Sequence, residues 1–378
     1  MNQDIRVARP IFPQKKKILK DIGSVLDSGR LMTGPYTASF EKKFAEYCGI
    51  KHAVAVNSCT AALEIVLRYI GVSGGDVIVP TNTFIATSNA VLFAGGRPVL
   101  ADVKDGTYYL DPDEVKRLIS KDTKAVIAVH IAGLIPPEIE EISKICRKHK
   151  IPLVEDCAHA IGASYKNKPA GSFGIAGCFS FYPTKTMTTG TGGMITTADG
   201  KLAEFARSVR LHGAGTGGLA EIVNIGSDWF MDEISAVLGV YQLESLGRFL
   251  KNRRQIASRY DALLSTTCSI KKLPVSNLSK HAYYKYPVQI ERDIDVSALK
   301  KSFRVKYGFE LESLYWPTCH LQPVYREMFG SKRGRFPNAE AILAKQVTLP
   351  IHAVMRTEDA EYAFRSLISE IELKERGR

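Results

Sequence analysis

The feature that most constrains the fold is a regular alternation of short β-branched runs with helical patterns between about residues 53 and 197. In the helical pattern at 138–150, apolar side chains recur on one face. Strands that are apolar on both faces and alternate with helices predict an α/β fold with a mainly parallel sheet sandwiched by helices. The expected strands are 53–56, 77–79, 99–103, 126–129, 151–154, 178–181 and 194–197.

The C-terminal third has a different pattern. Two helical patterns cover 231–246 and 250–264, and beyond them a strand is expected at 286–290 and a helix at 358–371. A chain of 378 residues is long for one core. We therefore expect a large domain with an N-terminal arm over residues 1–250 and a smaller α+β domain over residues 251–378.

Composition excludes some classes of protein. No apolar run is long enough to cross a membrane, and the N-terminus lacks the basic-then-apolar order of a secretory signal. The seven cysteines form no CxxC pair, which favours free thiols in a reducing cytoplasm. The net charge of +12 is dispersed along the chain, without a helix-turn-helix or zinc-finger signature. That charge favours anionic metabolites over nucleic acid as partners.

Polar residues follow several of the expected strands. Ser58-Cys59-Thr60, Thr83-Phe84, His130, and Asp156 with His159 each come just after a strand end. In an open α/β sheet, ligands bind beyond the carboxyl ends of the strands, so the topology should gather these residues at one edge. Ser58-Cys59-Thr60 also precedes a helical pattern, and its backbone N–H groups would suit an anion there, although a plain helix cap fits the same residues.

A carboxylate and a lysine stand out within 154–197. Asp156 ends an apolar strand, and Lys185 lies in the run KTMTTGTGG, unlike an ordinary surface lysine among charges. Pyridoxal phosphate (PLP) needs this pair of groups, because a lysine amine forms a Schiff base with it and a carboxylate keeps its pyridine nitrogen protonated. Ser/Thr/Gly-rich surroundings that bury the amine partly would lower its pKa for that purpose.

The motifs resemble one family over nearly the whole chain. EDCAHAIGASY and GSFGIAGCFSFYPTKTMTTGTGG, together with SGRLMTGPY, RLHG, MDEISAVLGVYQLESL and HLQPVYRE, are similar to the DegT/DnrJ/StrS family of PLP-dependent sugar aminotransferases. The resemblance implies PLP-dependent transferase fold type I, as in aspartate aminotransferase. It also implies a homodimer with shared active sites.

The resemblance also implies roles for individual residues. As catalytic residues it gives Lys185, Asp156 and His159, the first as the Schiff-base lysine and the second as the partner of the pyridine nitrogen. The residues expected to bind the cofactor are Ser58, Cys59, Thr60, Phe84, Asp156, His159, Ser180, Lys185 and Asp228. The residues expected to contact the substrate are Thr33, Tyr182 and His320. No metal site is expected.

Four positions depart from the family pattern. Cys59 stands where the family has glycine, and Thr191 replaces a glutamate. Asp228 and Phe230 replace an asparagine and an arginine, and the asparagine reaches the neighbouring subunit's cofactor phosphate in relatives. A carboxylate facing a phosphate is repelled, so Asp228 could take the asparagine's place only with a cation or a proton between the two groups.

These observations predict an aminotransferase for amino-sugar biosynthesis. It would move an amino group from a donor such as glutamate to a nucleotide-activated keto-sugar. Alternatives are transfer to an unactivated keto-cyclitol or keto-sugar acid, a PLP-dependent sugar dehydratase, and a PLP-binding regulator without turnover. The dehydratases carry histidine in place of the Schiff-base lysine, so Lys185 argues against them.

Overall fold

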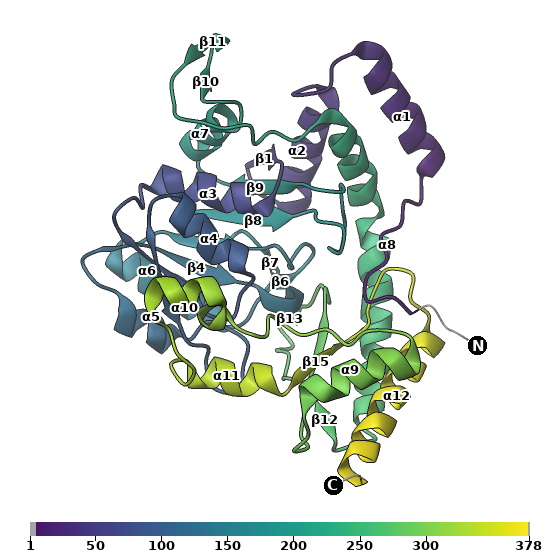
Figure 1. Ribbon diagram of the computed structural model, residues 1–378. Helices are drawn as coiled ribbons and strands as arrows, with labels where there is room; N and C mark the ends of the chain where they lie inside the picture. The colour runs from purple at the N-terminus through teal and green to yellow at the C-terminus, as the bar shows by residue number, and fades with distance from the viewer. Residues whose placement is uncertain (1–4, 377–378) are drawn as a thin grey trace.

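A seven-stranded sheet forms the centre of the computed structural model, which describes residues 5–376 (Figure 1). The strand order is β1-β9-β8-β5-β4-β2-β3. The pairs β3–β2, β2–β4, β4–β5 and β5–β8 are parallel, whereas β9 is antiparallel to both β8 and β1. The strands are β1 (His52–Val56), β2 (Asp76–Pro80), β3 (Arg97–Ala101), β4 (Thr123–Val129), β5 (Leu153–Asp156), β8 (Ala176–Ser180) and β9 (Gly193–Thr197). All seven expected strands are confirmed within a few residues.

The two faces of this sheet bury two separate apolar cores. In β1, Ala53 and Ala55 point into one core, while Val54 and Val56 point into the other. This period of two is what a strand covered on both faces requires. The first core includes α2 (Pro35–Cys48), α5 (Pro112–Leu118), α6 (Glu138–His149) and part of α8; the second includes α3 (Cys59–Ile70), α4 (Ile85–Phe93) and α7 (Gly200–Val209).

One long helix, α8 (Glu233–Leu264), runs along one side of the molecule and reaches the C-terminal part (Figure 1). We predicted two helices, at 231–246 and 250–264, and the break between them is wrong. Gly247 lies inside the helix, where its cost of about 1 kcal/mol relative to alanine is small against the packing of the buried side chains around it. At the N-terminus of α8, Asp232 accepts a hydrogen bond from Ser235 N.

The C-terminal part has its own small sheet. Strands β12 (Ile270–Lys271), β14 (Tyr286–Ile290) and β15 (Gln346–Leu349) pair antiparallel. They share a core with the end of α8, α9 (Val296–Tyr307) and α12 (Thr357–Arg376). Residues 314–343 behave differently, because Leu314, Phe336 and Leu343 pack in the second core of the large sheet. The predicted division at residue 250 stays a prediction, and residues 1–4 and 377–378 of the two predicted domains lie outside the described residues.

The remaining elements are short or peripheral. They are α1 (Lys15–Ser28), β6 (Ser164–Tyr165), β7 (Lys168–Pro169), β13 (Ser279–Lys280), the hairpin β10 (Ala214–Gly215) and β11 (Gly218–Ile222), α10 (Pro323–Phe329), α11 (Pro337–Ala344) and the 3-10 turns Ile131–Gly133 and Cys319–Leu321. The hairpin projects from one end of the molecule (Figure 1). Within residues 5–376, no helix is long and apolar enough to span a bilayer.

Candidate active site

A cavity of about 420 Å³ opens where strands β1, β4 and β5 end. Ser58 and Cys59 follow β1, Val129 ends β4, and Asp156 ends β5. The parallel strands deliver these residues to one edge, as predicted. Of the predicted site residues, the cavity is lined by Ser58, Cys59, Thr60, Phe84, Asp156, His159, Ser180, Tyr182 and Lys185.

Asp156 lies in this cavity with both carboxylate oxygens held. Oδ2 accepts a hydrogen bond from the Thr87 hydroxyl at 2.7 Å, and Oδ1 accepts one from Ala158 N at 3.0 Å. Thr87 is in turn within 2.7 Å of the Thr83 hydroxyl. Each carboxylate oxygen has two lone pairs, so one further bond on each remains possible. The orientation of Asp156 is therefore fixed, and its carboxylate can still accept a hydrogen bond from a group in the cavity.

The loop between β8 and β9 carries Lys185 and owes its shape to threonine hydroxyls. Thr188 donates to Phe181 O at 2.8 Å and accepts from Gly190 N at 2.9 Å. The Thr191 hydroxyl donates to Asn57 O at 3.0 Å, which ties the loop to the residue before Ser58. The threonine hydroxyls thus supply hydrogen bonds to backbone groups of the loop, which has no β-ladder to satisfy them. Thr191, which departs from the family pattern, has this structural contact.

The other end of the cavity is the N-terminus of α3. Ser58 caps the helix, since its hydroxyl accepts from Ala61 N at 3.1 Å. The first N–H groups of a helix have no partner within it and favour an anion. A Cβ at Gly193 would lie 2.4 Å from Ser58 C, so only glycine lets β9 approach this turn. Cys59 starts the helix, and its thiol points toward Cys178 O at 3.4 Å rather than blocking the N–H groups.

His159 is a buried, neutral member of the cavity wall. Its Nδ1 accepts from Ala132 N at 3.2 Å, and Nε2 is 2.7 Å from the Tyr315 hydroxyl. Burial lowers the pKa of His159 well below its usual value, and the charges of Lys185 and Lys285 lower it further. His159 therefore carries no charge near neutral pH.

Sequence reasoning missed an aromatic and lysine wall from the C-terminal part. Tyr284, Lys285 and Tyr315 line the cavity. The Lys185 ammonium lies 4.6 Å from the centre of the Tyr284 ring. Burial raises the pKa of Tyr284, but the charges of Lys185 and Lys285 outweigh it and the net pKa is lowered. The cluster YYKY at 283–286 was the available signal, but it lies far from the other motifs in sequence.

Phe84 and Tyr182 stand at the cavity with more than half of each residue exposed, at 56% and 58%. The Phe84 ring centre is 5.6 Å from that of Tyr315, with the planes tilted by 42°. An exposed ring on a cavity wall is available to stack on a flat ligand. The predicted role of Phe84 as a platform for the pyridine ring stays a prediction, as does substrate contact by Tyr182.

His320 does not line the cavity of the single chain, and its expected contact with the substrate stays a prediction. The ring is fully buried, with Nδ1 at 2.7 Å from the Thr81 hydroxyl and 2.8 Å from that of Thr318. Its Nε2 lies 3.0 Å from Glu340 Oε1. Both ring nitrogens are already engaged, and no face of His320 is open to a ligand.

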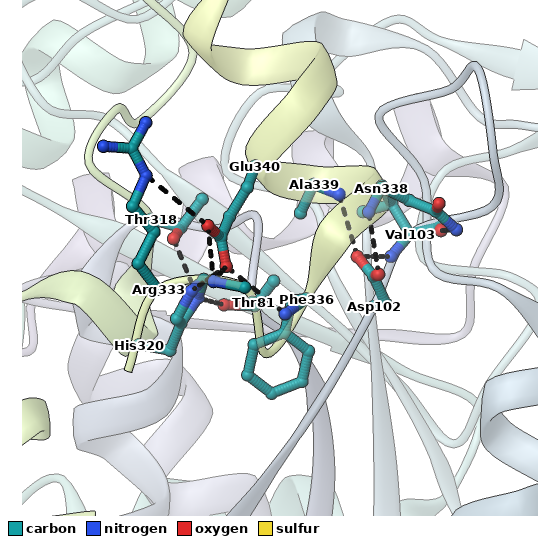
Figure 2. Close-up of polar contacts among 11 residues, drawn as sticks. Thr81, Asp102, Val103, Thr318, His320, Arg333, Phe336, Asn338, Ala339 and Glu340 are labelled. Carbon is teal, nitrogen blue, oxygen red and sulfur yellow. Dashed lines mark hydrogen bonds and ion pairs between the residues drawn. The ribbon is translucent and has the colours of Figure 1, made fainter. Parts of the chain in front are cut away.

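The surroundings of His320 fasten helix α11 to the sheet (Figure 2). Glu340 of α11 accepts from Gly334 N at 2.8 Å as well as facing His320. Asp102, just after β3, accepts from Asn338 N at 3.0 Å and Ala339 N at 2.9 Å. A carboxylate at these first N–H groups caps the helix from another part of the chain. We call His320, Glu340, Thr81, Thr318 and Asp102 the α11 clamp.

Asp228 and Thr33 are also outside the cavity lining. Asp228 lies in a segment that runs beside the start of the site, because its carbonyl accepts from Asn57 Nδ2 at 3.1 Å. The carbonyl of Thr33 accepts from Arg30 Nη2 at 2.9 Å in the turn before α2. Within a single chain, neither residue lines the cavity, so their expected roles stay predictions.

His130, Glu155 and Cys157 have ligand atoms close enough together for a metal ion. However, Glu155 already accepts from Gly171 N at 2.9 Å and from Phe173 N at 2.6 Å, and it faces His130 at 2.8 Å. This carboxylate is satisfied by backbone donors, as buried carboxylates require. These bonds tie the loop between β7 and β8 to Glu155 of β5.

The cavity fits pyridoxal phosphate. The N-terminus of α3 and Ser180 supply donors for a phosphate, Asp156 supplies a carboxylate with free lone pairs, and Lys185 supplies the amine. Gly193, where a Cβ would collide with the turn, keeps that end of the cavity open to the backbone donors. The donor set therefore matches the three polar parts of this cofactor: phosphate, ring nitrogen and aldehyde.

Comparison with known proteins agrees with this geometry. Residues 13–367 match the profile of the DegT/DnrJ/EryC1/StrS aminotransferase family. A relative, the GDP-perosamine synthase of Caulobacter vibrioides, is 33% identical over 345 residues, covering 88% of this chain and 90% of the relative.

Two solved structures share the whole architecture. PseC of Helicobacter pylori, an aminotransferase involved in the biosynthesis of pseudoaminic acid, has a TM-score of 0.90 at 28% identity, covering 98% of this chain and 100% of that one. The PLP form of the putative sugar aminotransferase Spr1654 from Streptococcus pneumoniae has a TM-score of 0.90 at 26% identity, covering 99% of both chains. The fold is thus PLP-dependent transferase fold type I, and the chain belongs to the DegT/DnrJ/EryC1/StrS family as a PLP-dependent sugar aminotransferase.

Proposed function

We propose that the protein transfers an amino group from glutamate to the ketone of a nucleotide-linked keto-sugar, in the biosynthesis of an amino sugar. The observation that carries the proposal is the convergence of Lys185 and Asp156 on one cavity that also contains the N-terminus of α3. The occurrence of a GDP-sugar synthase among the relatives supports a nucleotide-linked substrate. The net charge of +12 suits such an anion.

Each residue has one task in this reaction. When bound, pyridoxal phosphate supplies an aldehyde that takes up the amino group and a ring that withdraws electrons from the reacting carbon. Lys185 Nζ would move a proton between the substrate carbon that carries the nitrogen and the C4′ carbon of the cofactor, as a positioned general base and then acid. Asp156, held by Thr87 and Ala158 N, would keep the proton on the ring nitrogen. The helix N-terminus at Cys59 and Thr60 would hold the phosphate.

His159 would act as a neutral partner in this site. Its Nδ1 accepts a backbone hydrogen bond, so the proton of the neutral ring resides on Nε2, toward the Tyr315 hydroxyl. We infer that the ring fixes Tyr315 and covers one side of the cofactor without adding charge. Substitution of His159 should therefore affect binding of the cofactor more than the pH dependence of turnover.

The proposed function is tested in two parts. Borohydride reduction of the cofactor-loaded protein should attach the cofactor covalently to Lys185, as mapped by peptide mass spectrometry. The amino-loaded protein is then offered a panel of nucleotide-linked keto-sugars, free keto-sugars and free keto-cyclitols, and the return of the aldehyde absorbance identifies the acceptor. Attachment to another lysine would refute the site, and reaction with free keto-cyclitols alone would refute the nucleotide-linked substrate.

We further infer that the protein is a homodimer whose active sites are shared. Supporting this, the hairpin and the segment after it expose Leu219, Ile222, Val223 and Ile225, the last at 86%. Exposed apolar side chains grouped on a projecting hairpin are typical of a surface that contacts a partner. Analytical ultracentrifugation should give a dimer at assay concentration, and a fully active monomer would refute the shared site.

A further inference from the structure

Lys285 is a charged residue in the active-site wall that the proposed chemistry does not use. It lies directly before strand β14 and lines the main cavity together with Lys185. Its side chain is only 14% exposed and forms an ion pair with Glu312. A buried ammonium is costly unless it has partners, so its position next to a ligand cavity calls for an explanation.

A second, smaller cavity adjoins the first at this point. It has about 50 Å³ and is lined by Val7, Ala8, Thr184, Tyr284, Lys285, Glu312, Thr348, Leu349 and Ile351. Thr184, Tyr284 and Lys285 line both cavities. We call it the side cavity. Since one water needs roughly 10–15 Å³ of such space, the side cavity has room for a carboxylate but not for a diphosphate.

Within residues 5–376, two lysines lie near the single carboxylate that lines the side cavity. Lys285 and Lys300 lie close to one carboxylate, Glu312, and burial followed by the charge of Lys285 lowers the pKa of Lys300 to about 8. Glu312 takes at most part of the donor capacity of Lys285, because an ammonium has three N–H bonds. The Thr348 hydroxyl is buried in the same cavity and has no hydrogen-bond partner within residues 5–376.

We propose that Lys285, with the Thr348 hydroxyl, binds a carboxylate of a substrate in the side cavity. The proposal rests on the proposed function, since it places this carboxylate beside the reacting centre at Lys185. Both lysines face the Tyr284 ring, at 4.6 Å for Lys185 and 5.8 Å for Lys285. A substrate carboxylate held by Lys285 would orient the reacting carbon toward Lys185. That carboxylate belongs either to the amino donor or to an acidic keto-sugar.

Equilibrium binding to the cofactor-loaded protein tests the proposal without turnover. Glutarate represents the donor, because it has two carboxylates and no amino group, and glucuronate represents an acidic sugar. Isothermal titration compares the wild type with Lys285→Met. We expect Kd for one of the two ligands to rise roughly 10- to 100-fold, the effect of losing a charged hydrogen bond. The ligand that is weakened identifies the source of the carboxylate.

Three further variants make the test specific. Lys285→Arg retains the charge and should keep most of the affinity, and Lys280→Met, at an exposed lysine on the same stretch of chain, should leave Kd unchanged. Glu312→Gln removes the competing carboxylate and should lower Kd several-fold, a result that misfolding cannot produce. The absorbance of the bound cofactor checks each variant.

Unchanged Kd for both ligands in Lys285→Met, or no tightening in Glu312→Gln, would overturn the proposal. So would a wild type that binds neither ligand. Failure of the proposed function looks different: the wild type would then bind the carboxylate through Lys285 but transfer no amino group to any keto-sugar. Normal amino transfer with unaffected Lys285 variants would refute the side cavity alone.

Discussion

Two clusters of histidine and carboxylate lie near the carboxyl ends of the same sheet, and they serve opposite purposes. In the active site, Asp156 and His159 border a cavity of about 420 Å³, and Asp156 keeps free lone pairs. In the α11 clamp, both nitrogens of His320 are engaged and Glu340 also accepts backbone hydrogen bonds. A buried histidine near the strand ends thus indicates chemistry here only where it borders a cavity with unused bonding capacity, and His320 instead stabilises the fold.

The largest difference between the two clusters should appear on substitution of Lys185. Lys185→Ala should lower turnover at least about 10³-fold, because positioned proton transfer is lost together with the attaching amine. The free energy of unfolding of the cofactor-free protein should change little, since Lys185 is half-buried in a loop held by threonines. Single-turnover absorbance with glutamate measures the rate. Lys201→Ala, at an exposed position in α7, is the control, and residual turnover above 10% would contradict the assignment.

Asp156→Asn should be the next largest effect. An amide cannot balance the charge of a protonated ring nitrogen, so turnover should fall about 10²-fold. The cofactor should still bind, because the helix N-terminus and Ser180 are untouched. Equilibrium dialysis gives the cofactor affinity and stopped-flow absorbance gives the rate. Near-normal turnover would show that another residue partners the ring nitrogen.

How far the sequence predicts this molecule depends on whether a residue acts through local pattern or through packing. The sheet, its strands and the pair Asp156–Lys185 follow from periodicity and from a motif within one stretch of chain. Tyr284 and Lys285 reach the cavity only because residues 283–286 fold back from the small sheet, which no local pattern specifies. The position of His320 outside the cavity has the same reason, since its enclosure depends on α11 docking twenty residues later.

The α11 clamp should respond in stability rather than in turnover. Glu340→Gln keeps the shape but removes the charge that His320 and Gly334 N face, so the free energy of unfolding should fall by about 1–3 kcal/mol. Turnover per bound cofactor should stay within about threefold of wild type. Urea denaturation and steady-state assays measure the two quantities. Glu358→Gln, at an exposed position in α12, is the control. Loss of turnover in Glu340→Gln at unchanged stability would show that the α11 clamp takes part in the reaction.

Another buried histidine, His281, lies outside the active-site cavity and tests whether burial alone tunes stability. Burial lowers its pKa to about 3, and the charges of Lys272 and Arg254 add to the shift. Its Nδ1 accepts from Tyr283 N at 2.8 Å, a bond that protonation would break. The unfolded chain binds this proton below a pKa near 6.5 whereas the folded chain does not, so His281 lowers stability as pH falls from about 6.5 toward 3.

His281→Asn keeps an acceptor for Tyr283 N but removes the titration. Between pH 7 and pH 6, the free energy of unfolding should therefore fall by about 0.7 kcal/mol less in His281→Asn than in wild type. The difference is smaller than the roughly 1.4 kcal/mol per pH unit of a fully titrating group, because the unfolded histidine is only partly protonated in this range. Urea denaturation at the two pH values measures the difference, and turnover at pH 7 should be unaffected. An equal loss of stability in both proteins would mean that the unfolded and folded states bind this proton alike. Burial alone would then not explain why histidines outside the cavity stay neutral.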